Sequence, residues 1–109
     1  MLAGKFILTG KKEFAKIKES GRLVQSESFG VSYIKTGSQL KFGFIVSNKI
    51  SNSAVKRNKI KRALKDGVRD FLSEFKTGIT LVFFAKPKAT LLTRLQIINE
   101  VKYVLAKIN

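Results

Sequence analysis

Ile79-Thr80-Leu81-Val82-Phe83-Phe84-Ala85 is a continuous apolar run from which the arrangement of the other elements can be predicted. A short apolar run of this kind is typical of a β-strand. Its apolar residues stand next to one another instead of alternating with polar ones, so both faces of the strand must be covered. We therefore predict a strand at a central position of a sheet.

Amphipathic helices are predicted on both sides of this strand. The upstream helix is capped by Asn52 or Ser53 and ends at Thr77-Gly78. Its apolar residues fall in one stripe, made of Ile60, Leu64, Val68, Phe71 and Phe75. Lys86-Pro87-Lys88 breaks the chain after the strand, and a C-terminal helix follows. The apolar residues of that helix are Leu91, Leu95, Ile98, Val101, Leu105 and Ile108.

The first half of the chain predicts one short helix and further strands. The helix covers residues 11–20 and stops at Gly21. Residues 29–34 and 40–47 alternate with a period of two around a turn at 36–38, which predicts a hairpin with one apolar face. A strand at 22–25 is only weakly indicated. The result is a two-layer α+β sandwich with the order α-β-β-β-α-β-α.

Composition favours a single folded domain with a polyanionic partner. The 109 residues suffice for one core, and we take residues 1–109 as one domain. The formal net charge is +15, from 22 Lys and Arg against 7 Asp and Glu. Cysteine and histidine are absent, which excludes disulfides, zinc–thiolate sites and histidine-dependent nucleophiles. Without a signal peptide or a transmembrane segment, we expect a soluble, cytoplasmic protein.

The positive charge is concentrated at the start of the upstream helix. Six basic residues lie between positions 56 and 65, with no acidic residue among them. Like charges four positions apart repel one another on a helix, and an anionic partner reverses that cost. Although many charge runs are merely solvated, this one favours a nucleic-acid backbone. The spacing does not distinguish DNA from RNA.

Two weaker patterns keep alternatives open. The hairpin aromatics Phe29, Tyr33, Phe42 and Phe44 could stack on unpaired bases, but core packing is favoured for Phe42 and Phe44. Asp66, Asp70 and Glu74 form an acidic stripe that could hold a magnesium ion. Ion pairs with nearby arginines explain that stripe more simply.

One motif gives a family resemblance. Arg57-Asn58-Lys59-Ile60-Lys61-Arg62, followed by Lys65, resembles the basic helix of the protein subunit of bacterial ribonuclease P. The preceding strand, Phe42-Gly43-Phe44-Ile45-Val46-Ser47-Asn48-Lys49, and the helix start, Asn52-Ser53-Ala54-Val55, are similar to the same family. The resemblance extends over nearly the whole chain.

The resemblance implies a subunit of an endoribonuclease that removes the 5′ leader from precursor tRNA. Catalysis would reside in an RNA subunit, which would also bind most of the magnesium ions, so no catalytic residue or metal ligand is expected on the protein. The implied partners are this RNA and the single-stranded leader, with no DNA and no membrane, and we expect a monomer in the absence of RNA. The implied fold includes a left-handed βαβ crossover like that of a ribosomal protein domain, against a strong right-handed norm.

Site residues follow from the same resemblance. The residues expected to bind RNA are Lys56, Arg57, Asn58, Lys59, Lys61, Arg62 and Lys65. A leader cleft is expected between the sheet and the basic helix, with Phe14, Lys18, Ser32, Phe44, Lys61 and Lys65. Lys18 and Ser32 stand where the family often has aromatic residues, so charge is expected to replace part of the stacking in the cleft.

Two other functions remain open on the sequence. The chain could be a structural RNA-binding protein of the ribosomal type, with the same charge and fold but no role in cleavage. It could also be a protein-only nuclease that uses magnesium at the stripe of Asp66, Asp70 and Glu74.

Overall fold

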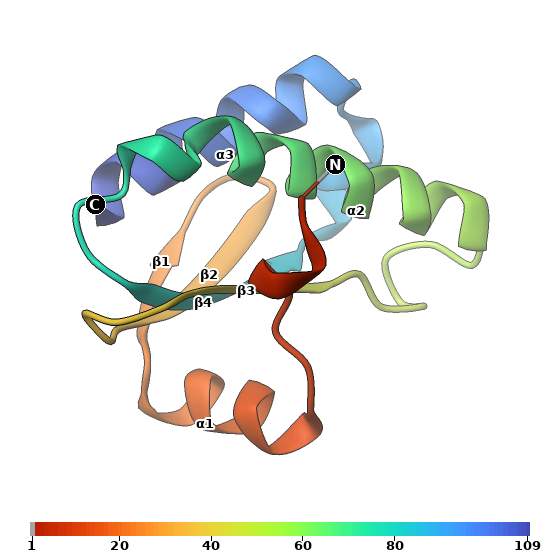
Figure 1. Ribbon diagram of the computed structural model, residues 1–109. Coiled ribbons are helices and arrows are strands. Elements are labelled where there is room, and N and C mark those ends of the chain that lie inside the picture. Colours follow the sequence, from red (N-terminus) through yellow and green to blue (C-terminus); the bar gives the residue numbers. More distant parts are fainter. Residues whose placement is uncertain (1) are drawn as a thin grey trace.

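A computed structural model describes residues 2–109 and contains one four-stranded mixed sheet (Figure 1). The strands are β1 (Arg22–Gln25), β2 (Phe29–Lys35), β3 (Leu40–Ile45) and β4 (Ile79–Ala85), in the spatial order β1-β2-β4-β3. β4 pairs with β2 antiparallel and with β3 parallel. The prediction that residues 79–85 form the central strand is confirmed.

The predicted hairpin of β2 and β3 is wrong. The two strands follow each other in sequence, but β4 lies between them and pairs with both. The turn between them is held to the start of β4, because Thr36 N and Gly37 N both donate to Gly78 O at 3.0 Å. Alternation of apolar and polar residues predicts which face of the sheet each residue occupies. It does not predict which strand is the hydrogen-bonded neighbour.

The helices lie on both faces of the sheet (Figure 1). α2 (Ala54–Phe71) and α3 (Arg94–Ile108) lie side by side on one face and with the sheet make the predicted two-layer sandwich. α1 (Lys11–Ser20) lies on the opposite face, which the sequence did not predict. α2 joins the parallel neighbours β3 and β4, and this crossover is left-handed.

The main core fills the space between the sheet and the α2–α3 layer. Its largest fully buried side chains include Phe29, Phe42 and Phe83 from the sheet and Leu64 from α2. A Cβ atom added at Gly67 of α2 would lie 3.0 Å from Val101 of α3, so this glycine permits the close approach of the two helices.

Both long helices differ from their predicted limits. α2 ends at Phe71, and a 3₁₀ turn over Leu72–Glu74 separates it from Phe75. The Phe75 ring still packs in the core, 5.6 Å from the Phe42 ring. An aromatic residue can thus reach the core from a turn, and the apolar stripe alone does not mark where a helix ends.

α3 begins later than predicted. Leu91 belongs to a 3₁₀ helix over Pro87–Leu91, and α3 starts after a capping box in which Thr93 and Gln96 bond each other's backbone N–H groups. Leu91 and Leu95 are 79% and 67% exposed, so their assignment to the apolar stripe is wrong. The buried face of α3 consists of Ile97, Ile98, Val101, Val104, Leu105 and Ile108.

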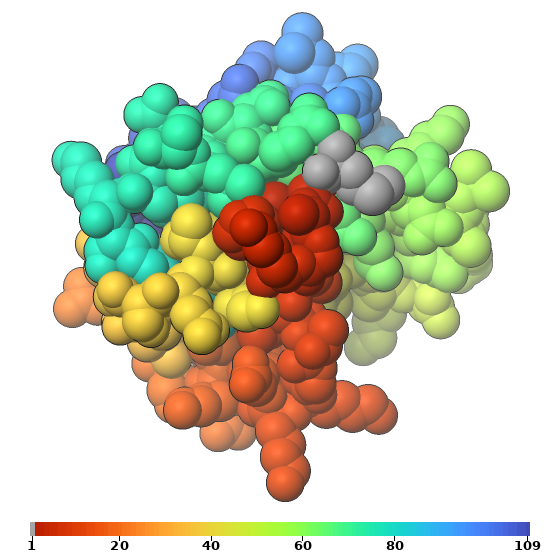
Figure 2. All heavy atoms as spheres, in the orientation of Figure 1, coloured from red at the N-terminus to blue at the C-terminus, as the bar shows by residue number. Residues whose placement is uncertain are grey.

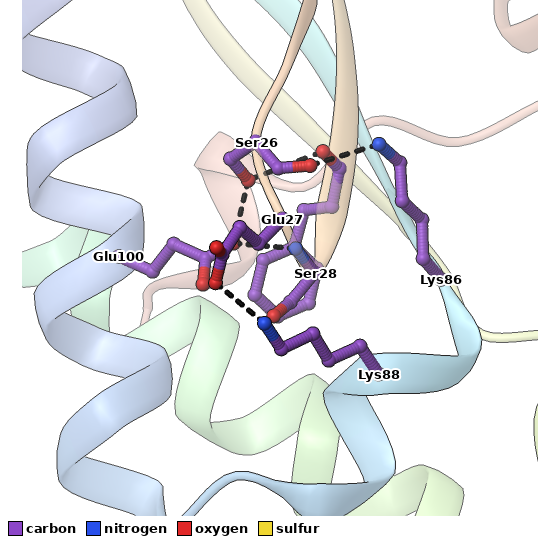
Figure 3. A network of polar contacts seen from close by, with 7 residues as sticks. Ser26, Glu27, Ser28, Lys86, Lys88 and Glu100 are labelled. Atoms are coloured by element: carbon purple, nitrogen blue, oxygen red, sulfur yellow. Dashed lines mark hydrogen bonds and ion pairs between the residues drawn. The ribbon is translucent and has the colours of Figure 1, made fainter.

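A polar network ties the β1–β2 turn to α3 and to the end of β4 (Figure 3). One Glu100 carboxylate oxygen accepts hydrogen bonds from Ser26 Oγ at 2.5 Å and from Ser28 N at 2.9 Å. Lys86 Nζ donates to the Ser26 carbonyl at 2.8 Å, and Lys86 N donates to the Ser28 carbonyl at 2.8 Å. These bonds fix the start of β2 against the end of β4.

None of the helices within residues 2–109 combines the length and the apolarity that crossing a bilayer demands.

Candidate nucleic-acid interface

α2 presents its basic residues outward because its apolar stripe is fixed in the core. Ile60, Leu64 and Val68 are buried beneath the helix. Ser53 caps the first turn and accepts a hydrogen bond from Lys56 N at 3.2 Å, as predicted for Asn52 or Ser53. The first turn contains no acidic residue, so the positive end of the helix dipole adds to the side-chain charges.

Six of the seven basic residues of α2 form two separate stripes, one on each side of the buried stripe. The groove stripe consists of Lys56, Lys59 and Arg62, which are exposed and face α3. The edge stripe consists of Arg57, Lys61 and Lys65, which are half-buried and lie four residues apart on the other side. Asn58 is exposed on the outer surface of the helix.

The groove stripe borders a depression between α2 and the start of α3. This groove has a volume of about 360 Å³. Its apolar lining comes from Ile60, Ala63, Ala89, Leu92 and Ile97, and its basic lining from Lys56, Lys59, Arg62 and Arg94. No acidic side chain lines it among the described residues. Its charge therefore favours phosphate groups.

The edge stripe has one member that also serves the fold. Arg57 Nη1 donates a hydrogen bond of 2.7 Å to the Ser51 carbonyl and so holds the β3–α2 loop against the helix. On the same side of α2, the N-terminal segment lies over the junction of α2 and β3, seen as the red patch between green and yellow in Figure 2. Leu8 N donates to the Phe42 carbonyl at 2.8 Å and covers part of the β3 edge.

The expected leader-cleft residues do not share one face. Phe14 and Ser32 lie on the α1 side of the sheet, and Lys18 extends from α1 toward the same side. Phe44 lies on the opposite side, where its ring stacks on Phe83 with the centroids 5.9 Å apart. Ser32 is buried at 4% exposure.

Lys61 and Lys65 are on the far side of the sheet from Phe14. The space between the sheet and α2, where a cleft was expected, is filled by the main core. Any strand of RNA that touches both Phe14 and Lys61 must therefore pass around the β3 edge of the sheet. Phe14 and Phe44, the two aromatic residues of the expected cleft, are both half-buried, one on each side of the sheet.

Phe84 is a further residue on the α1 side of the sheet that the sequence prediction missed. Its ring is half-buried on the α1 side of the sheet, beside Phe14, Ile34 and Ile45. A continuous apolar strand gives no alternation by which to assign its rings to one face. The signal in the sequence was Gly30, which pairs with Phe84 on the neighbouring strand β2 and leaves space for a large ring beside it.

Two carboxylates of the acidic stripe, Asp66 and Asp70, are engaged in ion pairs. Asp66 pairs with Arg94 and Arg69, and Asp70 pairs with Arg69 and Lys102. Burial raises the pKa of the Asp66 carboxyl, but the hydrogen bond from Arg94 and the charges of Arg94 and Arg69 outweigh burial and lower it below its usual value. Residues 2–109 contain no group of three His, Cys, Asp or Glu side chains placed to hold a metal ion.

Comparisons with known proteins agree with one another. Residues 2–109 match the family model described as Ribonuclease P. The ribonuclease P protein component of Finegoldia magna is 30% identical over 100 residues, which cover 92% of this chain and 88% of the relative. That of a Pseudanabaena species is 28% identical over 109 residues, covering 98% and 94%.

Solved structures show the same fold. The RNase P protein of Staphylococcus aureus superposes with a TM-score of 0.87 at 27% identity, covering 95% of each chain. The RNase P protein of Thermotoga maritima superposes with a TM-score of 0.83 at 23% identity, covering 94% of this chain and 96% of the other.

Proposed function

The chain belongs to the ribonuclease P protein family, and is thus a component of a tRNA-processing endoribonuclease; from this membership we propose that it binds two RNAs at once. One is the catalytic RNA subunit. The other is the single-stranded 5′ leader of precursor tRNA. The protein grips and positions both, and the RNA subunit performs the hydrolysis.

The observation that carries this proposal is the division of the α2 charges into two stripes. Lys56, Lys59 and Arg62 line the groove beside α3, whereas Lys61 and Lys65 lie on the other side of the helix, in step with Arg57, which bonds the β3–α2 loop. A single RNA that lay against one side of α2 would leave the charges of the other stripe without phosphate partners. Two polyanions on opposite sides of the helix use both stripes and release counterions from each.

Magnesium ions enter the proposal as cofactors held mainly by the RNA subunit. The carboxylates best placed on the protein, Asp66 and Asp70, are already engaged by Arg69, Arg94 and Lys102. The protein's contribution is electrostatic: it screens the repulsion between two RNAs and orients the leader, which brings the scissile bond to the metal ions.

The proposal is tested by adding the protein to a bacterial catalytic RNA and precursor tRNA at low magnesium. We expect cleavage to rise above that of the RNA alone. Leader binding should depend steeply on salt, with affinity falling roughly 300-fold between about 0.05 and 0.2 M salt if six phosphates of the single strand are contacted.

Other outcomes would support other functions. If cleavage does not rise and the protein co-purifies with ribosomal RNA, a structural role of the ribosomal type replaces this proposal. Magnesium-dependent cleavage by the RNA-free protein, lost in Asp66→Asn, would support a protein-only nuclease.

A further inference from the structure

The outer side of α3 carries a tyrosine that packing of the fold does not explain. Tyr103 is 60% exposed and is not among the residues of the main core, whereas its neighbours Val104 and Leu105 are buried there. A single exposed apolar residue is common on protein surfaces and indicates nothing by itself. The residues around Tyr103 therefore decide whether its ring has a role in binding.

Two polar residues flank the tyrosine on the same side of the helix. Asn99 and Lys107 lie four residues before and after Tyr103, and side chains at this spacing are neighbours on a helix surface. Both are exposed. The Lys107 ammonium lies 4.4 Å from the centroid of the Tyr103 ring, in cation–π contact. These three residues, which we call the α3 ridge, combine an amide, an aromatic ring and a cation.

The charge of α3 favours an anionic partner for this ridge. The exposed charged residues of the helix are all basic, namely Arg94, Lys102 and Lys107. The one acidic residue of α3, Glu100, is half-buried and accepts hydrogen bonds from Ser26 and Ser28 of the β1–β2 turn (Figure 3).

Lys107 is the cation of α3 best placed for a new partner. Arg94 and Lys102 already pair with Asp66 and Asp70 of α2, whereas the contact of Lys107 is with the tyrosine ring. Its side chain is exposed in the last turn of the helix. The Lys107 ammonium can therefore move from the ring to a phosphate without breaking an ion pair.

The α3 ridge is close to the groove stripe, which the proposed function assigns to the catalytic RNA. Arg94 lines the groove at the start of α3. Tyr103 follows nine residues later, which is about 14 Å along the helix axis. α3 and α2 lie on the same face of the sheet, and α1 lies on the opposite face (Figure 1). An RNA held in the groove can therefore continue over the outer side of α3.

An unpaired nucleotide matches the chemistry of the α3 ridge. A base stacks on an aromatic ring without regard to sequence, its phosphate binds a cation, and an amide can hydrogen-bond the edge of a base. We propose that α3 binds an unpaired nucleotide of the catalytic RNA, with the base on Tyr103, the phosphate on Lys107 and Asn99 beside the base. This inference rests on the proposed binding of the catalytic RNA and adds a contact surface outside α2.

The test measures binding of the catalytic RNA to the whole protein. Tyr103→Leu removes the ring from an exposed position, and we expect roughly tenfold weaker binding. Tyr103→Phe keeps the ring and should bind as the original protein does. Lys107→Gln should weaken binding and reduce the slope of its salt dependence by about 0.7, the value for one phosphate of a single strand.

The same helix offers a matched control. Leu95 is 67% exposed and lies eight residues before Tyr103, which is about two turns. Leu95→Ala removes exposed apolar surface but no ring, and it should leave the affinity for the catalytic RNA unchanged. If Leu95→Ala weakens binding as much as Tyr103→Leu does, the loss is not due to stacking and the inference is wrong.

Intrinsic fluorescence gives a second readout, because the chain contains two tyrosines and no tryptophan. In Tyr33→Phe the emission comes from Tyr103 alone, and stacking on a base should quench it when the catalytic RNA is added. In Tyr103→Phe the emission comes from the half-buried Tyr33, which controls for light absorbed by the RNA. Quenching should be stronger in Tyr33→Phe than in Tyr103→Phe.

The outcomes separate this inference from the function on which it rests. Equal affinity of the original protein and Tyr103→Leu, or equal quenching in the two fluorescence variants, overturns the role of Tyr103 while binding of the catalytic RNA stands. If the original protein does not bind the catalytic RNA, the proposed function itself fails. The preference for leader-bearing over mature tRNA should persist in Tyr103→Leu, and its loss would mean that α3 binds the leader instead.

Discussion

Single residues of the basic run have different tasks, although their chemistry is alike. One guanidinium nitrogen of Arg57 donates a hydrogen bond to the Ser51 carbonyl. Arg57 therefore stabilises the fold in addition to any contact it makes with RNA. Asn58 faces outward and is free to add a directional hydrogen bond to a surface otherwise made of charges. The sequence shows the clustering of these residues, and only the three-dimensional structure separates their roles.

Asp66 gives a residue-scale prediction for the dependence of stability on pH. Its pKa is lowered in the folded state, so its charged form stabilises the fold above the ordinary aspartate pKa, and this stabilisation is lost as pH falls through the lowered value. Asp66→Asn should reduce the free energy of unfolding at pH 7. Urea unfolding at pH 7 and near pH 2 measures the difference, which should shrink at the lower pH.

The control for this prediction is an exposed carboxylate with a simpler partner. Glu27 pairs with Lys88 at the surface, and its pKa is lowered by the hydrogen bond and charge of that lysine. Surface pairs of this kind contribute little to stability. A larger loss at pH 7 in Glu27→Gln than in Asp66→Asn would contradict the expectation that the Asp66 ion pairs stabilise the fold more than the surface pair of Glu27 does.

Among the elements of the described residues, the sequence predicted every α-helix and strand, but it predicted neither the 3₁₀ helices nor all of the strand neighbours. β4 was predicted as central because its apolar residues are continuous, and the pairing confirms this. The pairing of β2 with β4 instead of β3 depends on long-range contacts that no local period contains. The face covered by α1 was missed for the same reason.

Some element boundaries could have been predicted better. Thr93 and Gln96 have the spacing of a capping box, which marks the start of α3. The apolar residues Leu91 and Leu95 concealed that signal, because they continue the helical spacing backward although both are exposed. The leader-cleft residues were divided between two faces for a comparable reason: the motif gives their order along the chain but not the side of the sheet.

The two stripes of α2 predict two separable defects. Replacing Lys56 and Lys59 by Gln should weaken binding of the catalytic RNA and reduce the slope of its salt dependence by about two. Replacing Lys61 and Lys65 by Gln should weaken leader-bearing tRNA more than mature tRNA. Filter binding across a salt series, with both tRNAs and with the catalytic RNA, measures all three affinities.

The pairs of substitutions control for each other because each removes two lysines from the same helix. If both pairs weaken all three RNAs to the same extent, the charges act as one diffuse field and the division into stripes has no functional meaning. Equal loss of leader-bearing and mature tRNA in the second pair would assign Lys61 and Lys65 to the catalytic RNA.

At the scale of the whole molecule, the charge opposes the fold. A net charge of +15 is confined within principal extents of 36 × 27 × 25 Å. Many positive groups are therefore closer together than they would be in the unfolded chain, and their repulsion destabilises the compact state. Binding of RNA removes this cost, which links stability to the presence of the partner.

This repulsion predicts that salt stabilises the free protein. Raising the ionic strength from about 0.05 to 0.5 M shortens the screening length and should raise the thermal midpoint of unfolding. A variant with Lys11, Lys12 and Lys16 of α1 replaced by Gln should show a smaller rise. A midpoint that is flat or falls across this range would mean that the ion pairs of α2 and α3 outweigh the repulsion.

The central position of β4 also has a consequence for the order in which the chain can fold during synthesis. β3 has no strand partner until residues 79–85 have left the ribosome, and β2 has only the short β1. Contacts so distant in sequence form late, because a long loop must close first. The basic helix α2 is therefore synthesised before the sheet on which it packs is complete. Its lysines and arginines are exposed to the RNA-rich surface of the ribosome before packing has separated them into two stripes.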